Sequence, residues 1–288
     1  MPGSYGNGVT TVKDFRDKTA IITGAGSGLG RSLALQLHPA GARLALCDTD
    51  LASLQETLRL TGKSGKRVSL HRVDVADREQ MSQFAAEALS LHGTADILIN
   101  NAGISLTPMP FDEISEEQFE KVLNVNMWGV YNGTRAFLPH LRTRPEASIV
   151  NISSLAGLVG MYGYSSYSMS KFAVRGLSEA LQSELVRSEV SQLVHPGGVK
   201  TNFIRTAPNL ADDEREAAHA IFSKYATLDA DKTAGKILRA VQKKKGRLIL
   251  GVDAHLVYTI RKLFPGRFPK ILGAVFKQAW FKPKESNP

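Results

Sequence analysis

Apolar, β-branched runs alternate with helical segments along most of this 288-residue chain. The strand-like runs lie at residues 19–25, 43–50, 67–75, 95–103, 147–154, 191–198 and 246–252. Helical spacing is found between them at 31–41, 51–62, 77–92, 115–143 and 165–188, with Pro139 expected to kink or end the fourth helix. Such alternation is typical of βαβ units, in which helices cover both faces of a parallel sheet. It predicts an α/β fold, and no linker or repeat divides the single domain expected over 1–288.

Several protein classes do not fit the sequence. The one cysteine, Cys47, cannot form an internal disulfide, and residues 1–15 lack the apolar region of a signal peptide, so secretion is not supported. No stretch reaches the roughly 18 consecutive apolar residues of a transmembrane helix. The histidines have no metal-ligand spacing, so no metal is expected. The expected location is the cytoplasm, with association to a membrane surface as an alternative.

The net charge of +9 is concentrated near the C-terminus. Residues 232–288 carry 14 Lys and Arg against 2 Asp and Glu, and the stretch 255–284 is apolar as well as basic. It could be a helix packed on the body or on a neighbouring subunit, or an amphipathic surface that contacts an anionic membrane. Pro265 and Pro269 interrupt any long helix and weaken the second reading. No nucleic-acid motif accompanies the charge, so no nucleic-acid partner is expected.

A glycine-rich turn, TGAGSGLG at residues 23–30, follows the first strand and opens the first helix. Glycines permit close approach of the backbone to a ligand, and a helix N-terminus attracts a pyrophosphate. The glycines do not follow the GxGxxG spacing, and such a cluster alone is often a plain turn. Asp48 ends the next strand, where an acid can accept a hydrogen bond from the ribose 2′-OH of NAD and repel the 2′-phosphate of NADP. Its alternative role is the N-cap of the following helix.

Polar residues also follow the third and fourth strands. Asp74 could accept a hydrogen bond from the amino group of an adenine, and NNAG at residues 100–103 could line the ribose edge of a cofactor. Alone, each fits a loop cap equally well. In SSYSMSK, Tyr167 lies four residues before Lys171, so the two lie on one helix face. Alone, that pair would usually be ordinary helix surface.

Together these motifs, with PGGVKT at residues 196–201, resemble the short-chain dehydrogenase/reductase family in order and approximate spacing. The resemblance covers residues 18–252, leaving 253–288 as a basic, apolar extension. It implies a Rossmann-type, doubly wound parallel sheet of about seven strands in a single domain. It also implies hydride transfer between NAD(P) and a carbonyl or alcohol, and a homodimer or homotetramer.

The resemblance also assigns residue roles. Tyr167 is the expected acid–base, with Lys171 as its partner. Ser154, thirteen residues earlier, is the expected catalytic serine, with its neighbour Ser153 as the rival, and Asn126 matches the family's helix asparagine. The segment that contains Val199 and Thr201 is expected to hold the nicotinamide carboxamide. The full set of expected cofactor-binding residues is Gly24, Gly26, Ser27, Gly28, Leu29, Gly30, Asp48, Asp74, Val75, Asn101, Ala102, Gly103, Tyr167, Lys171, Pro196, Gly197, Val199 and Thr201.

The chemistry gives each catalytic residue a task. Ketone reduction needs a proton donor at the carbonyl oxygen, and a phenol of pKa about 10 is a poor one near neutrality. The charges of Lys171 and of an oxidised nicotinamide are expected to lower the pKa of Tyr167. Ser154 is expected to hold the substrate oxygen, and Lys171 also the nicotinamide ribose. Asn126 is expected to hold a water that links Lys171 to solvent.

The substrate is expected to be a hydrophobic carbonyl compound or secondary alcohol. Residues 202–230 resemble the family's cap over the substrate cleft, and no Arg or Lys pair marks a carboxylate or phosphate clamp. The apolar candidates for lining the cleft, each of which could instead be ordinary helix packing, are Phe203, Ile204, Ile221, Phe222 and Tyr225. Further apolar residues near the serine are Leu155, Leu158, Val159, Met161 and Tyr162. His195 is expected to serve packing or turn structure rather than catalysis.

Two alternatives stay open at this point. A protein of this fold could sense NAD(H) without catalysis, although the sign of that class would be a broken Ser–Tyr–Lys set, and here the set is intact. NADP could be preferred over NAD if Arg31 or Arg43 met its phosphate, but Asp48 argues against that.

Overall fold

A seven-stranded parallel sheet forms the centre of the computed structural model, which describes residues 12–62, 67–185, 191–270 and 273. Its strands are β1 (Thr19–Thr23), β2 (Arg43–Asp48), β3 (Val68–Arg72), β4 (Ile97–Asn100), β5 (Ser148–Ile152), β6 (Ser191–Pro196) and β9 (Arg247–Leu250). The order across the sheet is β3-β2-β1-β4-β5-β6-β9, so the chain winds outward in both directions from β1 and β4. This is the doubly wound, Rossmann-type arrangement that was predicted, and its switch point lies between β1 and β4.

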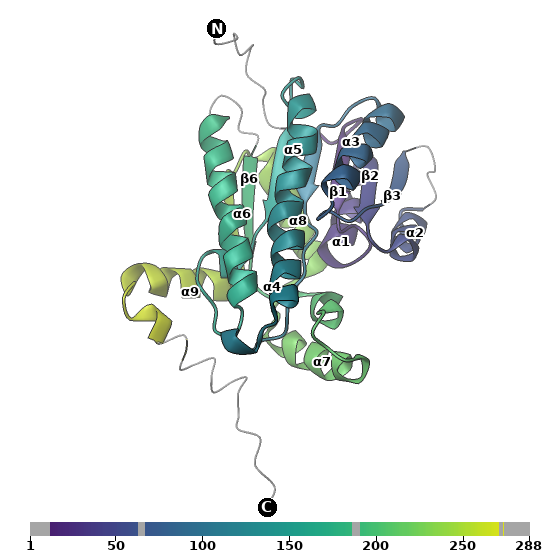
Figure 1. Cartoon of the computed structure of the whole chain (residues 1–288). Helices are drawn as coiled ribbons and strands as arrows, with labels where there is room; N and C mark the ends of the chain where they lie inside the picture. Colours follow the sequence, from purple (N-terminus) through teal and green to yellow (C-terminus); the bar gives the residue numbers. More distant parts are fainter. Residues whose placement is uncertain (1–11, 63–66, 186–190, 271–272, 274–288) are drawn as a thin grey trace, which may run out of the picture.

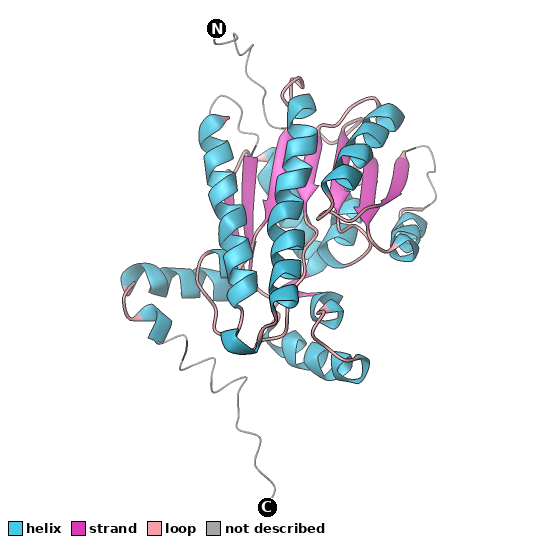
Figure 2. Cartoon of the chain, viewed as in Figure 1, coloured by secondary structure: helices cyan, strands magenta, loops and turns pink. Residues whose placement is uncertain are grey.

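Helices cover both faces of the sheet, as Figure 2 shows in cyan around the magenta strands. The α-helices are α1 (Gly28–Leu37), α2 (Leu51–Leu60), α3 (Arg78–His92), α4 (Glu116–Leu123), α5 (Gly129–Leu141), α6 (Ser165–Glu184), α7 (Arg215–Tyr225), α8 (Ala230–Gln242) and α9 (Val252–Leu263). Shorter turns are the 3-10 segments η1 (Phe111–Glu113), η3 (Leu155–Gly157), η4 (Asn202–Thr206) and η5 (Asp212–Glu214), and the π turn η2 (Asn124–Trp128). A separate parallel pair consists of β7 (Val199–Lys200) and β8 (Leu228–Asp229).

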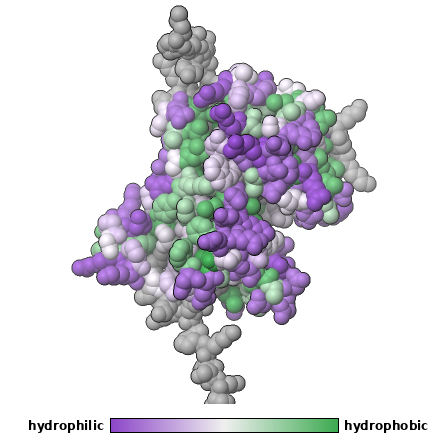
Figure 3. All heavy atoms as spheres, viewed as in Figure 1, coloured by the Kyte–Doolittle hydropathy of each residue, from purple (hydrophilic) through white to green (hydrophobic). Residues whose placement is uncertain are grey.

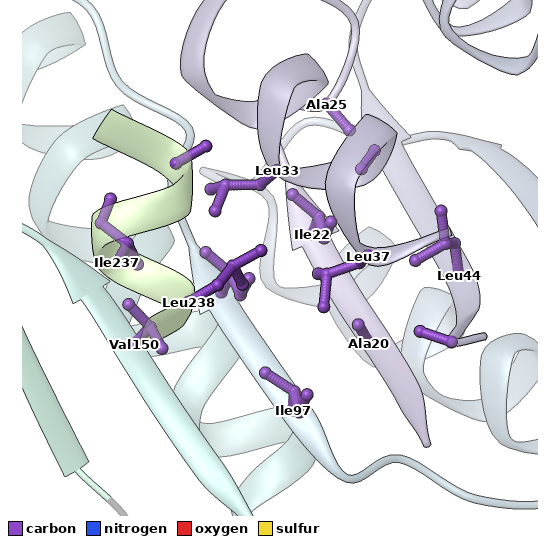
Figure 4. Packing of buried hydrophobic residues seen from close by; sticks show 14 of the residues in the cluster. Ala20, Ile22, Ala25, Leu33, Leu37, Leu44, Ile97, Val150, Ile237 and Leu238 are labelled. Atoms are coloured by element: carbon purple, nitrogen blue, oxygen red, sulfur yellow. The ribbon is translucent and has the colours of Figure 1, made fainter. Parts of the chain in front are cut away.

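One face of the sheet packs against α1 and α8. Figure 4 shows Ile22 of β1 and Val150 of β5 within the same buried cluster as Leu33 of α1 and Ile237 of α8. Successive side chains of a strand point to opposite faces, so Ile21 joins the other cluster, with residues of α3, α5 and α6. Figure 1 shows α3, α5 and α6 together on the near side of the sheet. The two clusters hold the strands in register, so that the carboxyl ends of the strands lie on the same side of the sheet.

The long helix predicted within residues 115–143 is confirmed, with one local irregularity. The single helix expected there is α4 and α5, joined by the π turn η2. Pro139 does not end the helix, which continues through it to Leu141. The interruption lies at the π turn instead, where Asn126 makes tertiary hydrogen bonds that helix periodicity does not reveal.

The basic C-terminal segment is described as far as residue 270 and at residue 273. There the segment packs on the body, because Ala254 of α9 and Phe268 beyond the helix share a buried cluster with Leu155. Its other side exposes Leu263 and Phe264, and Figure 3 shows hydrophobic and hydrophilic residues side by side at this edge. Among the described residues, no helix is both long and apolar enough to cross a membrane. The predicted membrane contact through 255–284 stays a prediction, and residues 271–272 and 274–284 lie outside the described residues.

Candidate active site

A cavity of about 850 Å³ opens at the carboxyl ends of the central strands. All of the residues predicted to bind cofactor or to act in catalysis line it, except Gly26, Gly30 and Asn126, which lie behind its wall. Ligands of doubly wound sheets bind at this edge, near the switch point. The fold therefore brings together in one cavity motifs that are far apart in the sequence.

The glycine turn is shaped for close approach of the backbone. Gly24 has a φ of +63°, which favours glycine, and a Cβ at Gly30 would lie 2.1 Å from the carbonyl oxygen of Gly24. The N-terminus of α1 has no side-chain hydrogen bond to its first turn from its N-cap, Ser27. Ser27 and Leu29 line the cavity, so the N–H groups of this first turn can bind a phosphate there. The cavity thus fits the pyrophosphate of a dinucleotide.

Asp48 is held at the cavity by the glycine turn. Its Oδ2 accepts a hydrogen bond from the Gly26 N–H at 2.9 Å, and its Oδ1 accepts one from the Asp50 N–H at 3.2 Å. The alternative role for Asp48 is wrong, because the N-cap of α2 is Asp50, whose side chain accepts from two backbone N–H groups of the helix. The Asp48 carboxylate is therefore free to meet a ligand in the cavity that it lines.

The two arginines considered for NADP are occupied elsewhere. Arg31 donates to the carbonyl oxygens of Gly26 and Ser53 and to the Thr57 hydroxyl. Arg43 donates to the Asp17 carbonyl oxygen at 2.9 Å. It is the first residue of β2, at the end of the strand opposite the cavity. Neither guanidinium lines the cavity.

The NNAG turn is tied to the end of β1. The Thr23 hydroxyl accepts hydrogen bonds from the N–H groups of Asn101 and Ala102, each at 3.0 Å, and the Asn101 side chain donates to the Thr23 and Gly24 carbonyl oxygens. Asp74 caps its own turn by accepting from the Ala76 N–H at 2.9 Å, and it also lines the cavity. Both motifs therefore cap their own loops and also line the cavity, because the capping hydrogen bonds fix the turns at the cavity wall.

The two candidate serines take different positions. Ser153 is buried, and its hydroxyl donates to the carbonyl oxygen of Lys171 at 2.9 Å, which ties β5 to α6. The Ser154 hydroxyl accepts from the Ala156 N–H at 3.2 Å and is hydrogen-bonded to Tyr167. Its backbone carbonyl is fixed by the buried His195, whose Nδ1 lies 2.9 Å from that oxygen. Ser154, rather than Ser153, therefore offers its hydroxyl beside the phenol.

Tyr167 and Lys171 both lie in the cavity wall, and burial there shifts the pKa of each toward its neutral form. Burial raises the pKa of Tyr167 to about 12, although its hydrogen bond with Ser154 acts in the opposite direction. Burial lowers the pKa of Lys171 to about 8. The ammonium nitrogen lies 5.6 Å from the centre of the Tyr167 ring and donates to the Ile152 carbonyl oxygen at 3.0 Å. The lowered Tyr167 pKa was predicted from the charges of Lys171 and an oxidised nicotinamide together. In the protein without cofactor, burial instead raises this pKa.

Asn126 is fully buried in the π turn and fixes the chain after NNAG. Its Oδ1 accepts from the Ile104 N–H at 2.8 Å, and its Nδ2 donates to the Ile104 carbonyl oxygen and the Ser170 hydroxyl. Its Oδ1 lies close to Lys171, since a Cβ at Gly103 would be 3.1 Å from that oxygen and 3.3 Å from the Lys171 ammonium. The predicted proton path through a water at Asn126 stays a prediction.

The substrate end of the cavity is apolar. Of the residues predicted to line it, those that do are Phe203, Ile204, Phe222, Tyr225, Leu155 and Met161. Ile221 is instead 42% exposed, Leu158 and Val159 belong to a buried cluster, and Tyr162 lines a separate pocket. Several further lining residues were not predicted, among them Tyr164, Asp253 and Val257. Tyr164 could have been found three residues before Tyr167 on the same helix face, whereas Asp253 and Val257 come from α9, where no motif pointed to a site.

Comparisons with known proteins agree with this geometry. A family model described as short chain dehydrogenase matches residues 18–210. The chain is 38% identical over 267 residues to the SadH protein of Mycobacterium tuberculosis, covering 91% of this chain and 96% of that one. It is 34% identical to mouse (Mus musculus) dehydrogenase/reductase SDR family member 7B, with 90% and 81% covered. A crystal structure of a short chain dehydrogenase/reductase from Burkholderia phymatum in complex with NAD has a TM-score of 0.79 at 30% identity, with 88% and 96% covered.

Proposed function

Given that the chain belongs to the short-chain dehydrogenase/reductase family, we propose that it is an oxidoreductase that interconverts a hydrophobic carbonyl compound and a secondary alcohol. The observation that carries the proposal is the meeting of Ser154, Tyr167 and Lys171 in one wall of a cavity whose opposite end holds the glycine turn and Asp48. NAD, when bound, supplies or accepts the hydride. The protein then has to handle only the substrate oxygen and its proton.

Tyr167 is proposed to carry the proton. In reduction, its hydroxyl hydrogen goes to the substrate oxygen as that oxygen gains charge, and in oxidation the proton returns. The Ser154 hydroxyl, which is hydrogen-bonded to Tyr167 in the protein without substrate, is proposed to turn its one hydrogen to the same oxygen. Burial raises the pKa of Tyr167 to about 12, so the phenolate needs positive charge nearby. The Lys171 ammonium lies 5.6 Å from the centre of the Tyr167 ring. An oxidised nicotinamide ring would add further positive charge.

We propose NAD rather than NADP as the preferred cofactor. The Asp48 carboxylate is fixed by the Gly26 N–H at the cavity wall, where it suits a ribose hydroxyl and repels a phosphate. Arg31 and Arg43 make their hydrogen bonds outside the cavity lining. The NAD complex of the related Burkholderia phymatum protein supports the same choice.

An apolar substrate is proposed from the lining of the cleft. Phe203 and Ile204 of η4, with Phe222 and Tyr225 of α7, lie over the cavity beside the Tyr167 ring, whose centre is 5.9 Å from that of Phe203. Residues 202–230 are therefore proposed to cap the substrate. A homodimer or homotetramer stays a prediction from the family, which sedimentation of the purified chain would check.

The experiment that tests the function is turnover by the purified full chain, followed through nicotinamide absorbance. Apolar ketones and secondary alcohols would be assayed with NADH or NAD and, in parallel, with NADPH or NADP. Turnover of apolar substrates with NAD supports the proposal. Tight NADH binding without turnover across the panel would favour the alternative of a catalytically silent NAD(H)-sensing protein. Turnover confined to small polar sugars or hydroxy acids would contradict the substrate class.

A further inference from the structure

One acid in the cavity has no part in the reaction described above. Asp253 lines the cavity from the first turn of α9, beyond the residues that the family model matches. Its position follows from the pairing of the last two strands, in which Pro196 of β6 lies beside Leu250 of β9 and the Gly197 N–H donates to the Leu250 carbonyl oxygen at 2.8 Å. The chain leaving β9 therefore passes next to Gly197 and carries Asp253 to the cavity.

Two glycines make room for this carboxylate. A Cβ at Gly197 would lie 2.3 Å from Asp253 Oδ2, and a Cβ at Gly251 would lie 2.2 Å from Asp253 Oδ1. Gly251 also has a φ of +104°, which side chains rarely allow, so the turn into α9 needs glycine on both counts. The Asp253 side chain is thus held between two backbone segments, with little freedom to turn away from the cavity.

The carboxylate lacks a partner. Asp253 Oδ1 is buried and accepts no hydrogen bond from any described residue, and the ion pairs found in the described part of the chain do not include Asp253. Its neighbours in the cavity wall and the adjoining cluster are apolar, namely Val257 on the next turn of α9 and Leu155 after the catalytic serine. Oδ1 is closed off against Gly251, but Asp253 as a whole is only half-buried. Its Oδ2, beside the cavity-lining Gly197, is therefore the oxygen that can accept a hydrogen bond from a ligand.

We propose that Asp253 accepts a hydrogen bond from the substrate, so that the preferred substrate is a hydrophobic carbonyl compound or alcohol with a second polar group that donates hydrogen bonds. A hydroxyl or an ammonium group has this chemistry. The inference rests on the proposed function, because it places the substrate between Tyr167 and α9. In this arrangement the donor group lies toward Gly197 and Val257, which line the same cavity.

The test uses three aryl alkyl ketones of equal length that end in a methyl, a hydroxyl or an ammonium group. Their dissociation constants would be measured by calorimetry on the NAD-saturated full chain, which cannot reduce a ketone, and kcat/KM would be measured separately with NADH. Wild-type protein should bind the two donor-bearing ketones about tenfold or more tightly than the methyl ketone. Asp253→Leu should abolish both preferences, and Asp253→Asn should weaken the ammonium preference more than the hydroxyl one. Asp231→Asn, the same change in the exposed first turn of α8, should alter neither.

The outcomes separate this inference from the function on which it rests. Equal or undetectable binding of all three ketones by the wild type, or preferences that survive in both Asp253 variants, would overturn it. A loss of NADH affinity in Asp253→Asn, measured by nicotinamide fluorescence, would also overturn it, since Asp253 would then hold the cofactor amide. A retained binding preference without turnover of any ketone would support the inference and count against the oxidoreductase function. Thermal unfolding of both variants would show whether the fold is intact.

Discussion

Ser153 donates a hydrogen bond to the backbone carbonyl oxygen of Lys171 at 2.9 Å, and this contact fixes the end of β5 against α6. The next residue, Ser154, then lies beside Tyr167. A Cβ at Gly157 would be 2.2 Å from the Ser153 hydroxyl oxygen, so the glycine leaves space for this contact. Two adjacent serines thus have separate tasks, one in positioning the helix and one in the reaction.

This division predicts different results for two neighbouring alanine variants. Ser154→Ala should lower kcat/KM by about 10²-fold to 10³-fold, because it removes a donor to the substrate oxygen, and should leave the free energy of unfolding nearly unchanged. Ser153→Ala should instead lower the free energy of unfolding by about 0.5–1.5 kcal/mol, because a buried hydrogen bond between the two elements is lost. Steady-state rates and urea unfolding of both variants check this. Equal kinetic defects would show that the two hydroxyls are not separated in role.

Cofactor choice should depend on Asp48. Asp48→Asn is expected to weaken NAD binding about tenfold, because a charged hydrogen bond to the ribose becomes a neutral one, and to strengthen NADP binding by removing a repulsive charge. Fluorescence titrations with NADH and NADPH measure both effects. Arg43→Gln, at the opposite end of β2, is the matched control and should change neither affinity. An unchanged ratio of the two affinities in Asp48→Asn would contradict the assignment.

The stability of the fold should fall in mild acid because of His195. Burial lowers the pKa of this imidazole from 6.5 to about 4, so the folded protein keeps it neutral where the unfolded chain takes up a proton. The neutral His195 therefore contributes fully to the free energy of unfolding above pH 6.5. That contribution is lost as the pH falls from 6.5 toward 4, by about 3 kcal/mol in total. His195→Asn keeps a donor for the Ser154 carbonyl oxygen and cannot titrate. Urea unfolding at pH 7.5 and 5 should show a smaller loss of stability for the variant than for the wild type, and equal losses would refute the assignment.

The membrane alternative for the C-terminal segment makes a separate prediction. The exposed Leu263 and Phe264 lie beside Arg261 and Lys262 on α9, so the full chain should pellet with vesicles that contain anionic lipid at low salt. Changing Leu263 and Phe264 to Glu should reduce pelleting, whereas Leu91→Glu, an equally exposed site on α3, should not. No pelleting by the wild type would leave α9 as a packed helix alone.

Much of the fold and of the cofactor end of the cavity could be predicted because their signals are local. The strands, the glycine turn, and the spacing of Tyr167 and Lys171 each follow from a few neighbouring residues. The π turn could not be predicted, since it depends on Asn126 bridging Ile104 and Ser170, which are distant in the sequence. Secondary-structure periodicity reports which face of a helix is apolar, but not which tertiary hydrogen bonds interrupt it.

The direction of the Tyr167 pKa and the lining of the substrate end of the cavity could not be predicted, for a related reason. The expected direction of the Tyr167 pKa considered the charges of Lys171 and of an oxidised nicotinamide but not burial, which dominates in the cavity wall without cofactor. Asp253 reaches the cavity only through the pairing of β6 with β9. In the sequence it is a single acid in a basic segment and belongs to no motif. Burial and long-range pairing are properties of the folded chain, and local sequence patterns do not contain them.

The most direct test of the central claim compares NADH binding and turnover in Tyr167→Phe. The variant keeps the ring that packs against Phe203 and loses only the hydroxyl, so NADH affinity should stay within about threefold of wild type while kcat falls by about 10²-fold to 10⁴-fold. Tyr164→Phe, three residues earlier in the same cavity wall, is the matched control and should have a far smaller effect. A Tyr167→Phe variant that binds NADH and retains wild-type turnover would show that another group carries the proton.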